Sequence, residues 1–318
     1  MKAAVFDRYG PASVMRIADV PQPVPAGHEV RVRVHATSVN RTDTGIRSGE
    51  PFPVRIVAGM RRPRHRILGT EFAGTVDAVG GSVSAFAVGD QVFGLNPWRF
   101  GTHAEFVCVR EQGVIATTPE GWSFEQAAAV CDGAILALIN LRRVHLQRGQ
   151  RLLVYGASGS IGTAAVQLAV AFGAHVTAVC GPNATALVHS LGAHDVLDYT
   201  QQDFAAGGEQ YDVIFDAVGK EHFLPRRHAL RRGGVWIASD GLTEVALAML
   251  NVRVEGRRVS SEIPPRFLQR DVWLIKRLME TGMYRAVIDR TYPLDDIVDA
   301  MAYVDTKQKL GNVVLTVA

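Results

Sequence analysis

Three glycines at regular spacing, Gly156, Gly159 and Gly162, carry the clearest chemical signal in this sequence. They lie in LLVYGASGSIG, where a short apolar run ends abruptly and a helical pattern begins at once. The first glycine permits a tight turn, the second lets main-chain N–H groups approach a pyrophosphate, and the third lets helix and strand pack closely. The helix N-terminus then offers N–H donors and a positive dipole end to phosphate. The pattern predicts a dinucleotide-binding turn.

The residues around this turn predict the elements that would position it. Arg151 to Tyr155 reads as a strand, and Ile161, Ala165 and Leu168 recur at the spacing of one buried helix face. A glycine-rich turn can also serve merely to reverse the chain, so its context decides. Four more strands are expected, with helical segments between them, at Ala174–Val179, Asp195–Asp198, Asp212–Phe215 and Gly234–Ala238. This alternation predicts a Rossmann doubly wound parallel sheet.

The chain on either side of this region shows a different residue pattern, with β-rich segments before it. Glu29 to His35 alternates polar and apolar residues as a half-buried strand does, and Gly69 to Val92 holds β-rich runs broken by glycines. Ser123 can cap a helix that starts at Phe124, with Gln126 completing a capping box. After the Rossmann region we expect an amphipathic helix at Arg270–Met279 and a final strand at Asn312–Val317.

Length and composition indicate a two-domain enzyme. The chain has 318 residues, 47% of them apolar, and a net charge of +3 without long charged blocks, so a nucleic-acid partner is unlikely and no membrane partner is expected. No uninterrupted apolar window is long enough to span a bilayer, and MKAAVFDRYG lacks a signal-peptide pattern, so a cytoplasmic location is expected. The scattered Cys108, Cys131 and Cys180 suit reduced thiols better than disulfides.

Motifs along nearly the whole chain resemble the medium-chain dehydrogenase/reductase superfamily, and within it the zinc-independent quinone oxidoreductase branch. The motifs are MKAAVFDRYG, VNRTDTGIRSG, LGTEFAGTVDAVG, VGDQVFG, the glycine turn, SLGAHDVLDY and FDAVG. The resemblance implies a β-rich, GroES-like catalytic domain made of residues 1–122 and 259–318, with a Rossmann cofactor domain, residues 123–258, inserted between them. It also suggests a homodimer.

The residues at the metal-ligand positions of the zinc-dependent relatives argue against zinc. Matched motif by motif, the three ligands fall on Asn40, Thr70 and Cys131. Amide and hydroxyl groups bind zinc poorly compared with thiolate and imidazole, and one cysteine cannot hold the ion. Without a Lewis acid the chemistry shifts from alcohol oxidation to reduction of an electron-poor acceptor. Cys131 is then most simply a small buried hydrophobe.

The resemblance places three polar residues near the expected nicotinamide. Asn40 would donate its amide to a substrate carbonyl or to the carboxamide, Thr42 lies where related dehydrogenases keep a relay hydroxyl, and Asp43 would orient either one. The alternative is that NRTD is only a turn or a helix cap, since these residue types satisfy local backbone groups well. His103 is interpreted as a structural histidine, and the protonation step can draw on water.

The span after the second Rossmann strand predicts the cofactor preference. An NAD-preferring site usually carries an acid there to hold the ribose diol, but neither Asp nor Glu occurs from Ala178 to His194. We therefore expect NADPH, although Arg and Lys are also missing from that span. By resemblance Tyr199 lies against the adenosine phosphate; the alternative is a half-buried tyrosine closing a strand. The cofactor-binding residues expected are Gly156, Ser158, Gly159, Ser160, Ile161, Gly162, Gly181, Asn183, Tyr199, Val218 and Asn312.

These observations leave two hypotheses. The first is an NADPH-dependent, zinc-independent oxidoreductase that transfers hydride to a quinone or an α,β-unsaturated carbonyl compound. The second is a non-catalytic NADPH-binding redox sensor or RNA-binding protein. An RNA-binding protein would use the arginine-rich segment VRIVAGMRRPRHR. The simplest interpretation of this segment is a solvated surface loop, and the alternatives are a site for an acidic substrate or for an anionic partner.

Overall fold

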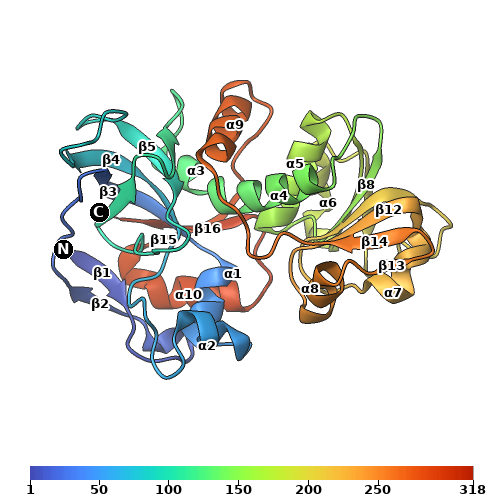
Figure 1. Cartoon of the computed structure of the whole chain (residues 1–318), viewed down its shortest axis with the longest axis horizontal. Coiled ribbons are helices and arrows are strands. Elements are labelled where there is room, and N and C mark those ends of the chain that lie inside the picture. Colours follow the sequence, from blue (N-terminus) through green and yellow to red (C-terminus); the bar gives the residue numbers. More distant parts are fainter. Residues whose placement is uncertain (318) are drawn as a thin grey trace. The chain divides into compact units, whose positions relative to one another are not determined.

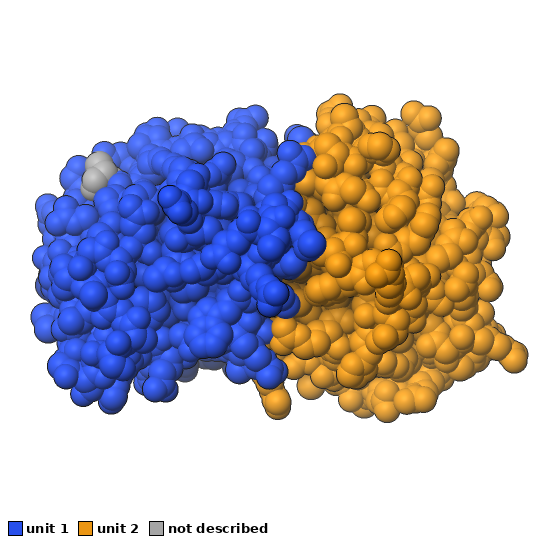
Figure 2. All heavy atoms as spheres, turned by 90° about the horizontal axis from the view of Figure 1, so that it is seen from above, with its two compact units in different colours: residues 1–132, 267–318 blue, residues 133–266 orange. Residues whose placement is uncertain are grey.

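The computed structural model describes residues 1–317, which form two compact units (Figures 1 and 2). Unit 1 comprises residues 1–132 together with the chain from residue 267 onward, and unit 2 comprises residues 133–266. The predicted boundaries, 122/123 and 258/259, lie somewhat before these points. The first difference has a physical reason: helix α3 (Phe124–Ala128) packs against strands of unit 1.

Unit 2 contains a seven-stranded sheet in the order β10-β9-β8-β11-β12-β14-β13, parallel except for β13. Its central strands are apolar and buried, as expected of a sheet covered on both faces. The α/β Rossmann prediction is confirmed. The strands are β8 Arg151–Tyr155, β9 His175–Cys180, β10 Asp195–Asp198, β11 Tyr211–Asp216, β12 Leu230–Ala238, β13 Arg253–Val254 and β14 Arg257–Ser260.

The helices of this region connect successive strands. Helix α5 follows β8 directly and ends where Gly173 adopts a left-handed φ of 79°, which closes the helix without a steric penalty. Trp236, Phe223 and Ile214 pack in the core of the unit. The helices are α4 Cys131–Arg143, α5 Ser160–Ala171, α6 Thr185–Ser190, α7 Phe223–Arg226 and α8 Leu242–Met249, with 3-10 turns η2 Pro182–Ala184 and η3 Arg227–Ala229.

Unit 1 is built on a second, mostly antiparallel sheet in the order β15-β16-β3-β4-β5-β7. The long strand β3 pairs with β4 along one edge, while β6 and β16 share the other. β1 and β2 form a separate pair. The strands are β1 Lys2–Val5, β2 Arg16–Asp19, β3 Glu29–Val39, β4 Glu71–Val79, β5 Gln91–Leu95, β6 Phe106–Arg110, β7 Val114–Thr117, β15 Ile288–Pro293 and β16 Asn312–Thr316.

The helices of unit 1 begin at side-chain caps that the sequence encodes. Ser123 and Gln126 form the predicted capping box of α3, and Asn40 and Asp43 form another at the start of α1. Phe6, Phe72 and Met301 pack in the core over the sheet. The other helices are α1 Arg41–Ser48, α2 Pro53–Ala58, α9 Gln269–Glu280 and α10 Ile297–Asp305, with 3-10 turns η1 Ala12–Val14 and η4 Leu294–Asp296.

The stretch Phe124–Arg143, which holds α3 and α4, is long and apolar enough by length and composition to cross a membrane, with a mean hydropathy of 1.4. However, 72% of its most apolar window is buried inside the protein. A helix of a folded core shows the same composition, so this stretch is weak evidence for a membrane span.

Candidate active site

The glycine turn of unit 2 has the geometry that its sequence predicts. Strand β8 ends at Tyr155, and Gly156 turns the chain with a φ of 75°. The N–H groups of Gly156 and Ala157 both donate to the Val179 carbonyl at 3.0 Å, which fixes the turn against β9. Helix α5 then starts at Ser160 with Gly159 as its N-cap. The first N–H groups of an α-helix have no carbonyl partner within the helix, so a helix N-terminus can bind a phosphate.

The space around each glycine shows which glycines the turn itself requires and which one leaves room for a ligand. A Cβ atom on Gly156 would lie 2.6 Å from Val218 Cγ1, and one on Gly162 would lie 2.1 Å from the Gly156 carbonyl oxygen. Both positions therefore need glycine for the turn itself. A Cβ on Gly159 would meet only the Gly156 oxygen, at 3.8 Å, so the space in front of this residue is open. An open position at a helix N-terminus fits a pyrophosphate.

The end of β9 brings two of the predicted cofactor residues together. A Cβ on Gly181 would lie 3.3 Å from the Tyr199 hydroxyl oxygen, and the exposed Asn183 follows in η2. The sheet register adds a carboxylate that the linear sequence did not reveal, because Asp198 pairs with Cys180 at this strand end. Its Oδ1 accepts hydrogen bonds from the Thr200 N–H and hydroxyl, at 2.9 and 2.8 Å.

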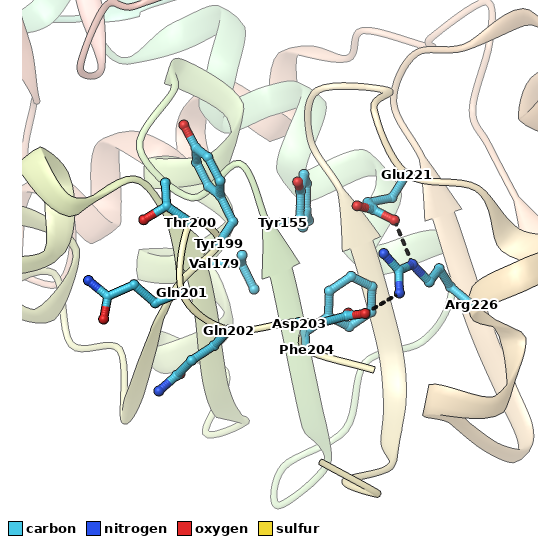
Figure 3. Close-up of a pocket in the computed structure, with 10 residues that line it drawn as sticks. All are labelled: Tyr155, Val179, Tyr199, Thr200, Gln201, Gln202, Asp203, Phe204, Glu221 and Arg226. Atoms are coloured by element: carbon cyan, nitrogen blue, oxygen red, sulfur yellow. Dashed lines mark hydrogen bonds and ion pairs between the residues drawn. The ribbon is translucent and has the colours of Figure 1, made fainter. Parts of the chain in front are cut away.

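A hollow of about 310 Å³ lies at the carboxyl ends of these strands (Figure 3). Sequence reasoning identified only Tyr199 in its lining. Arg226 donates to Asp203 and Glu221, and its guanidinium lies 5.4 Å from the Phe204 ring centroid. No spacing signal relates these residues, because they come from separate loops. The hollow is lined by Tyr155, Val179, Tyr199, Thr200, Gln201, Gln202, Asp203, Phe204, Glu221 and Arg226.

Acidic groups also shape the electrostatics of this strand end. Burial, and then the carboxylates of Glu221 and Asp216, raise the pKa of Tyr155 to about 12, so its hydroxyl stays protonated. Asp216, at the end of β11, accepts hydrogen bonds from the N–H groups of Val218, Gly219 and Glu221. These bonds fix the loop that places Val218 against Gly156.

The NRTD motif of unit 1 is a helix cap, as the alternative interpretation anticipated. The Asn40 Oδ1 accepts from the Asp43 N–H, and an Asp43 oxygen accepts from the Asn40 N–H. The other Asp43 oxygen accepts from the Gly69 N–H at 2.9 Å, and the side chain is fully buried. Asp43 therefore acts as a positioning residue that joins α1 to the loop before β4. A cap does not exclude a further role for Asn40, because its amide nitrogen has two hydrogens.

The first two positions that hold zinc in related enzymes bond to each other here. The Asn40 amide donates to the Thr70 hydroxyl at 3.0 Å. Burial, and then the nearby Glu71 and Asp132, raise the pKa of Cys131 well above its ordinary value, so this thiol is a poor thiolate donor. Within residues 1–317 no group of three His, Cys, Asp or Glu side chains is arranged to hold a metal ion.

The remaining predicted residues of unit 1 differ in accessibility. Thr42 is exposed on the first turn of α1, and its hydroxyl has no hydrogen-bond partner among the described residues. His103 is fully buried and its Nε2 lies 2.8 Å from the Ser38 carbonyl oxygen, which is a structural role. Asn312 donates its amide to the Val287 carbonyl at 3.1 Å. It belongs to unit 1 and not to the unit that carries the glycine turn.

A group of ionisable residues beside these positions was missed. Glu71 accepts from the Asp132 N–H at 2.7 Å and from the Ser38 hydroxyl. Burial and the neighbouring Asp132 raise the pKa of Glu71, while burial lowers the pKa of Lys309 to about 8 against the opposing pull of both carboxylates. The only sequence signal was the position of Glu71 next to Thr70 in GTE. The group can hold and exchange a proton.

Comparison with known proteins agrees with this geometry. Residues 26–120 match the family model of the alcohol dehydrogenase GroES-like domain, and residues 191–315 match the model named zinc-binding dehydrogenase. The second name describes the family model and does not assign a metal to this chain. The matches reach into both units and leave residues 121–190, which include the glycine turn, outside them.

Individual relatives are similar over the whole chain. The mouse NAD(P)H oxidoreductase RTN4IP1, mitochondrial, is 30% identical, covering 100% of this chain and 89% of its own length. The tomato (Solanum lycopersicum) 2-methylene-furan-3-one reductase is 28% identical over 99% of this chain and 79% of its own. The solved structure of the quinone oxidoreductase from Coxiella burnetii superposes with a TM-score of 0.91 at 27% identity, covering 100% of this chain and 99% of that one.

Proposed function

We propose a specific reaction for a chain whose family is known. The chain belongs to the medium-chain dehydrogenase/reductase superfamily, in its quinone oxidoreductase-like branch, and is an oxidoreductase that uses a nicotinamide cofactor. We propose that the cofactor is NADPH, that no zinc takes part, and that the acceptor is a quinone or an α,β-unsaturated carbonyl compound. The observation that carries the proposal is the replacement of metal ligands by the hydrogen-bonded pair Asn40 and Thr70.

Unit 2 supports the choice of cofactor. The pyrophosphate would lie in front of Gly159, where the space is open, and would accept hydrogen bonds from the first N–H groups of α5. The 2′-phosphate would lie at the end of β9, where Gly181 leaves room and the Tyr199 hydroxyl can donate. The Asp198 carboxylate at this edge opposes the phosphate, but its Oδ1 is held by Thr200.

Unit 1 supports the choice of acceptor. When bound, NADPH supplies the hydride, and reduction of a quinone or enone then develops negative charge on the acceptor oxygen. In a zinc-free site this charge must be met by hydrogen-bond donors. The exposed Thr42 hydroxyl and the second amide hydrogen of Asn40 are the candidates. The proton can come from water or from the group around Glu71.

A screen of NADPH consumption against benzoquinones, naphthoquinones and simple enones tests the proposal. We expect turnover with at least one acceptor class, a higher kcat/KM with NADPH than with NADH, and no change after dialysis against a chelator. Binding of NADPH without turnover on any acceptor would instead favour the non-catalytic sensor. Dependence of turnover on added zinc would refute the zinc-free site.

A further inference from the structure

Helix α2, labelled in Figure 1, and the residues at its two ends carry exposed apolar side chains. Phe52, Ile56, Val57 and Met60 expose 61, 59, 72 and 55% of their surface, respectively. Phe52 is the N-cap residue of α2 and Ile56 lies four residues further on, so these two side chains share one side of the helix, while Val57 follows Ile56 and Met60 lies after the turn at Gly59. Single exposed apolar residues are ordinary, but four on one short segment form a contact surface.

The segment presents this face because its other side is anchored. The Tyr9 hydroxyl donates to the Gly59 carbonyl, and the Arg55 guanidinium lies 4.8 Å from the Tyr9 ring centroid. The Arg55 Nε also donates to the Gly49 carbonyl at 3.1 Å. Gly59 has a φ of 123°, and a Cβ there would lie 2.1 Å from the Arg62 carbonyl oxygen, so the turn is tight. The apolar side chains therefore cannot simply fold inward.

Three arginines flank the apolar face. Arg61, Arg62 and Arg64 are exposed, and within residues 1–317 none of them has an ion pair with a carboxylate. The neighbouring Arg66 differs, because it pairs with Asp7. An apolar patch bordered by uncompensated cationic side chains matches the interface of an anionic bilayer, where apolar groups enter the acyl boundary and arginines contact phosphates.

We propose that this basic-apolar surface (Phe52, Ile56, Val57, Met60, Arg61, Arg62 and Arg64) binds peripherally to anionic phospholipid bilayers. A nucleic acid would use the arginines but would gain little from the aliphatic side chains, because phosphates and base edges do not bury them. This proposal departs from the expectation of no membrane partner, which relied on the lack of an uninterrupted apolar window long enough to span a bilayer. A peripheral contact needs no span. The proposal does not rest on the proposed reaction.

Sedimentation of the full-length protein with vesicles tests the proposal without any substrate. We expect binding to phosphatidylcholine vesicles that contain about one-third phosphatidylglycerol, weak binding to pure phosphatidylcholine, and weaker binding as salt rises. Each arginine is worth about fivefold in affinity. Arg61→Ser/Arg62→Ser should therefore reduce binding roughly 30-fold, and Ile56→Ser/Val57→Ser should reduce it by a similar factor or more.

Matched variants on unit 2 control for charge and hydropathy. Arg232→Ser/Arg253→Ser removes two exposed arginines, and Met249→Ser/Leu250→Ser removes two exposed apolar side chains. Both should bind vesicles as the parent protein does, and all variants should unfold at the parent temperature because the residues are exposed. Equal loss in the control variants overturns the proposal, as does equal binding to neutral vesicles. So does RNA binding that depends on the arginines alone, or a dimer that dissociates when the apolar pair is changed.

Discussion

A side chain added at either of the last two glycines of the turn should abolish or weaken NADPH binding, but only the one at Gly162 should also destabilise the fold strongly. Gly159 has extended backbone angles, with φ at −79° and ψ at 177°, and open space in front of its Cα. Gly159→Val should therefore fold, at a cost of about 1 kcal/mol for a poorer N-cap. The valine methyl groups would occupy the place of the pyrophosphate. Losing two hydrogen bonds to a charged group, each worth about 1.5–3 kcal/mol, should weaken NADPH binding at least about 100-fold.

Gly162→Ala should fail for a different reason. Its Cβ would lie 2.1 Å from the Gly156 oxygen and 2.7 Å from Ala157 Cα, and both are backbone atoms that cannot move aside without opening the turn. Overpacking typically costs about 1–3 kcal/mol, and a contact this short against backbone belongs at the upper end. We therefore expect a loss of about 3 kcal/mol in the free energy of unfolding together with the loss of NADPH binding.

Two measurements on each variant separate the effects. Intrinsic fluorescence of the four tryptophans reports NADPH titration, and urea unfolding reports stability. Gly207→Val is the control, because a Cβ at Gly207 also meets open space and has no atom of the glycine turn within 4 Å. It should leave both quantities unchanged. If Gly159→Val binds NADPH as the parent does, the pyrophosphate does not lie at this turn and the cofactor assignment fails.

Three further predictions concern specificity, turnover and pH. Gly181→Asp should reverse the cofactor preference to NADH, measured by fluorescence titration, because it puts a carboxylate beside the 2′-phosphate position near Tyr199. Asn40→Ala should lower kcat about 100-fold by removing a donor, and Thr42→Val should lower it at constant stability, measured by steady-state kinetics. Glu71→Gln should make the free energy of unfolding fall less steeply with pH, measured by urea unfolding at several pH values.

The sign of the pH effect follows from the burial of Glu71. Burial raises the folded pKa of Glu71 from 4.5 to about 8, so between these two pH values the folded state binds more protons than the unfolded state, and the stability that this group contributes falls as pH rises through that window. The glutamine removes up to about 1.4 kcal/mol per pH unit from that slope. An unchanged slope would contradict the burial argument.

Controls for the other two predictions use the same positions. Asn40→Ser keeps a side-chain oxygen that can cap α1 but removes the amide donor. Full turnover in that variant would show that the NRTD motif is a helix cap without a catalytic role. A parent protein that binds NADH more tightly than NADPH would refute the specificity argument before Gly181→Asp is made.

The helices and strands could be predicted well because the residues that determine them are close together in the sequence. Strand β8 occupies the predicted residues, and the capping box of α3 forms between Ser123 and Gln126 as expected. The group around Glu71 could not be predicted, because its members are far apart in the sequence. Asp132 and Lys309 reach Glu71 only through the tertiary fold, and a single sequence contains no spacing rule for such contacts.

The end of β9 illustrates the same limit where it affects specificity. The expectation of NADPH rests on an acid-free window of consecutive residues from Ala178 to His194. In a parallel sheet the end of one strand also borders the end of the next, and Asp198 pairs with Cys180. The Asp198 carboxylate would oppose a nearby phosphate, while the two hydrogen bonds from Thr200 fix the orientation of its Oδ1. Turning it toward the ribose would break two hydrogen bonds worth about 1 kcal/mol each. The charge that a phosphate meets in this fold therefore depends on strand order and side-chain orientation as well as on the residues that follow the second strand.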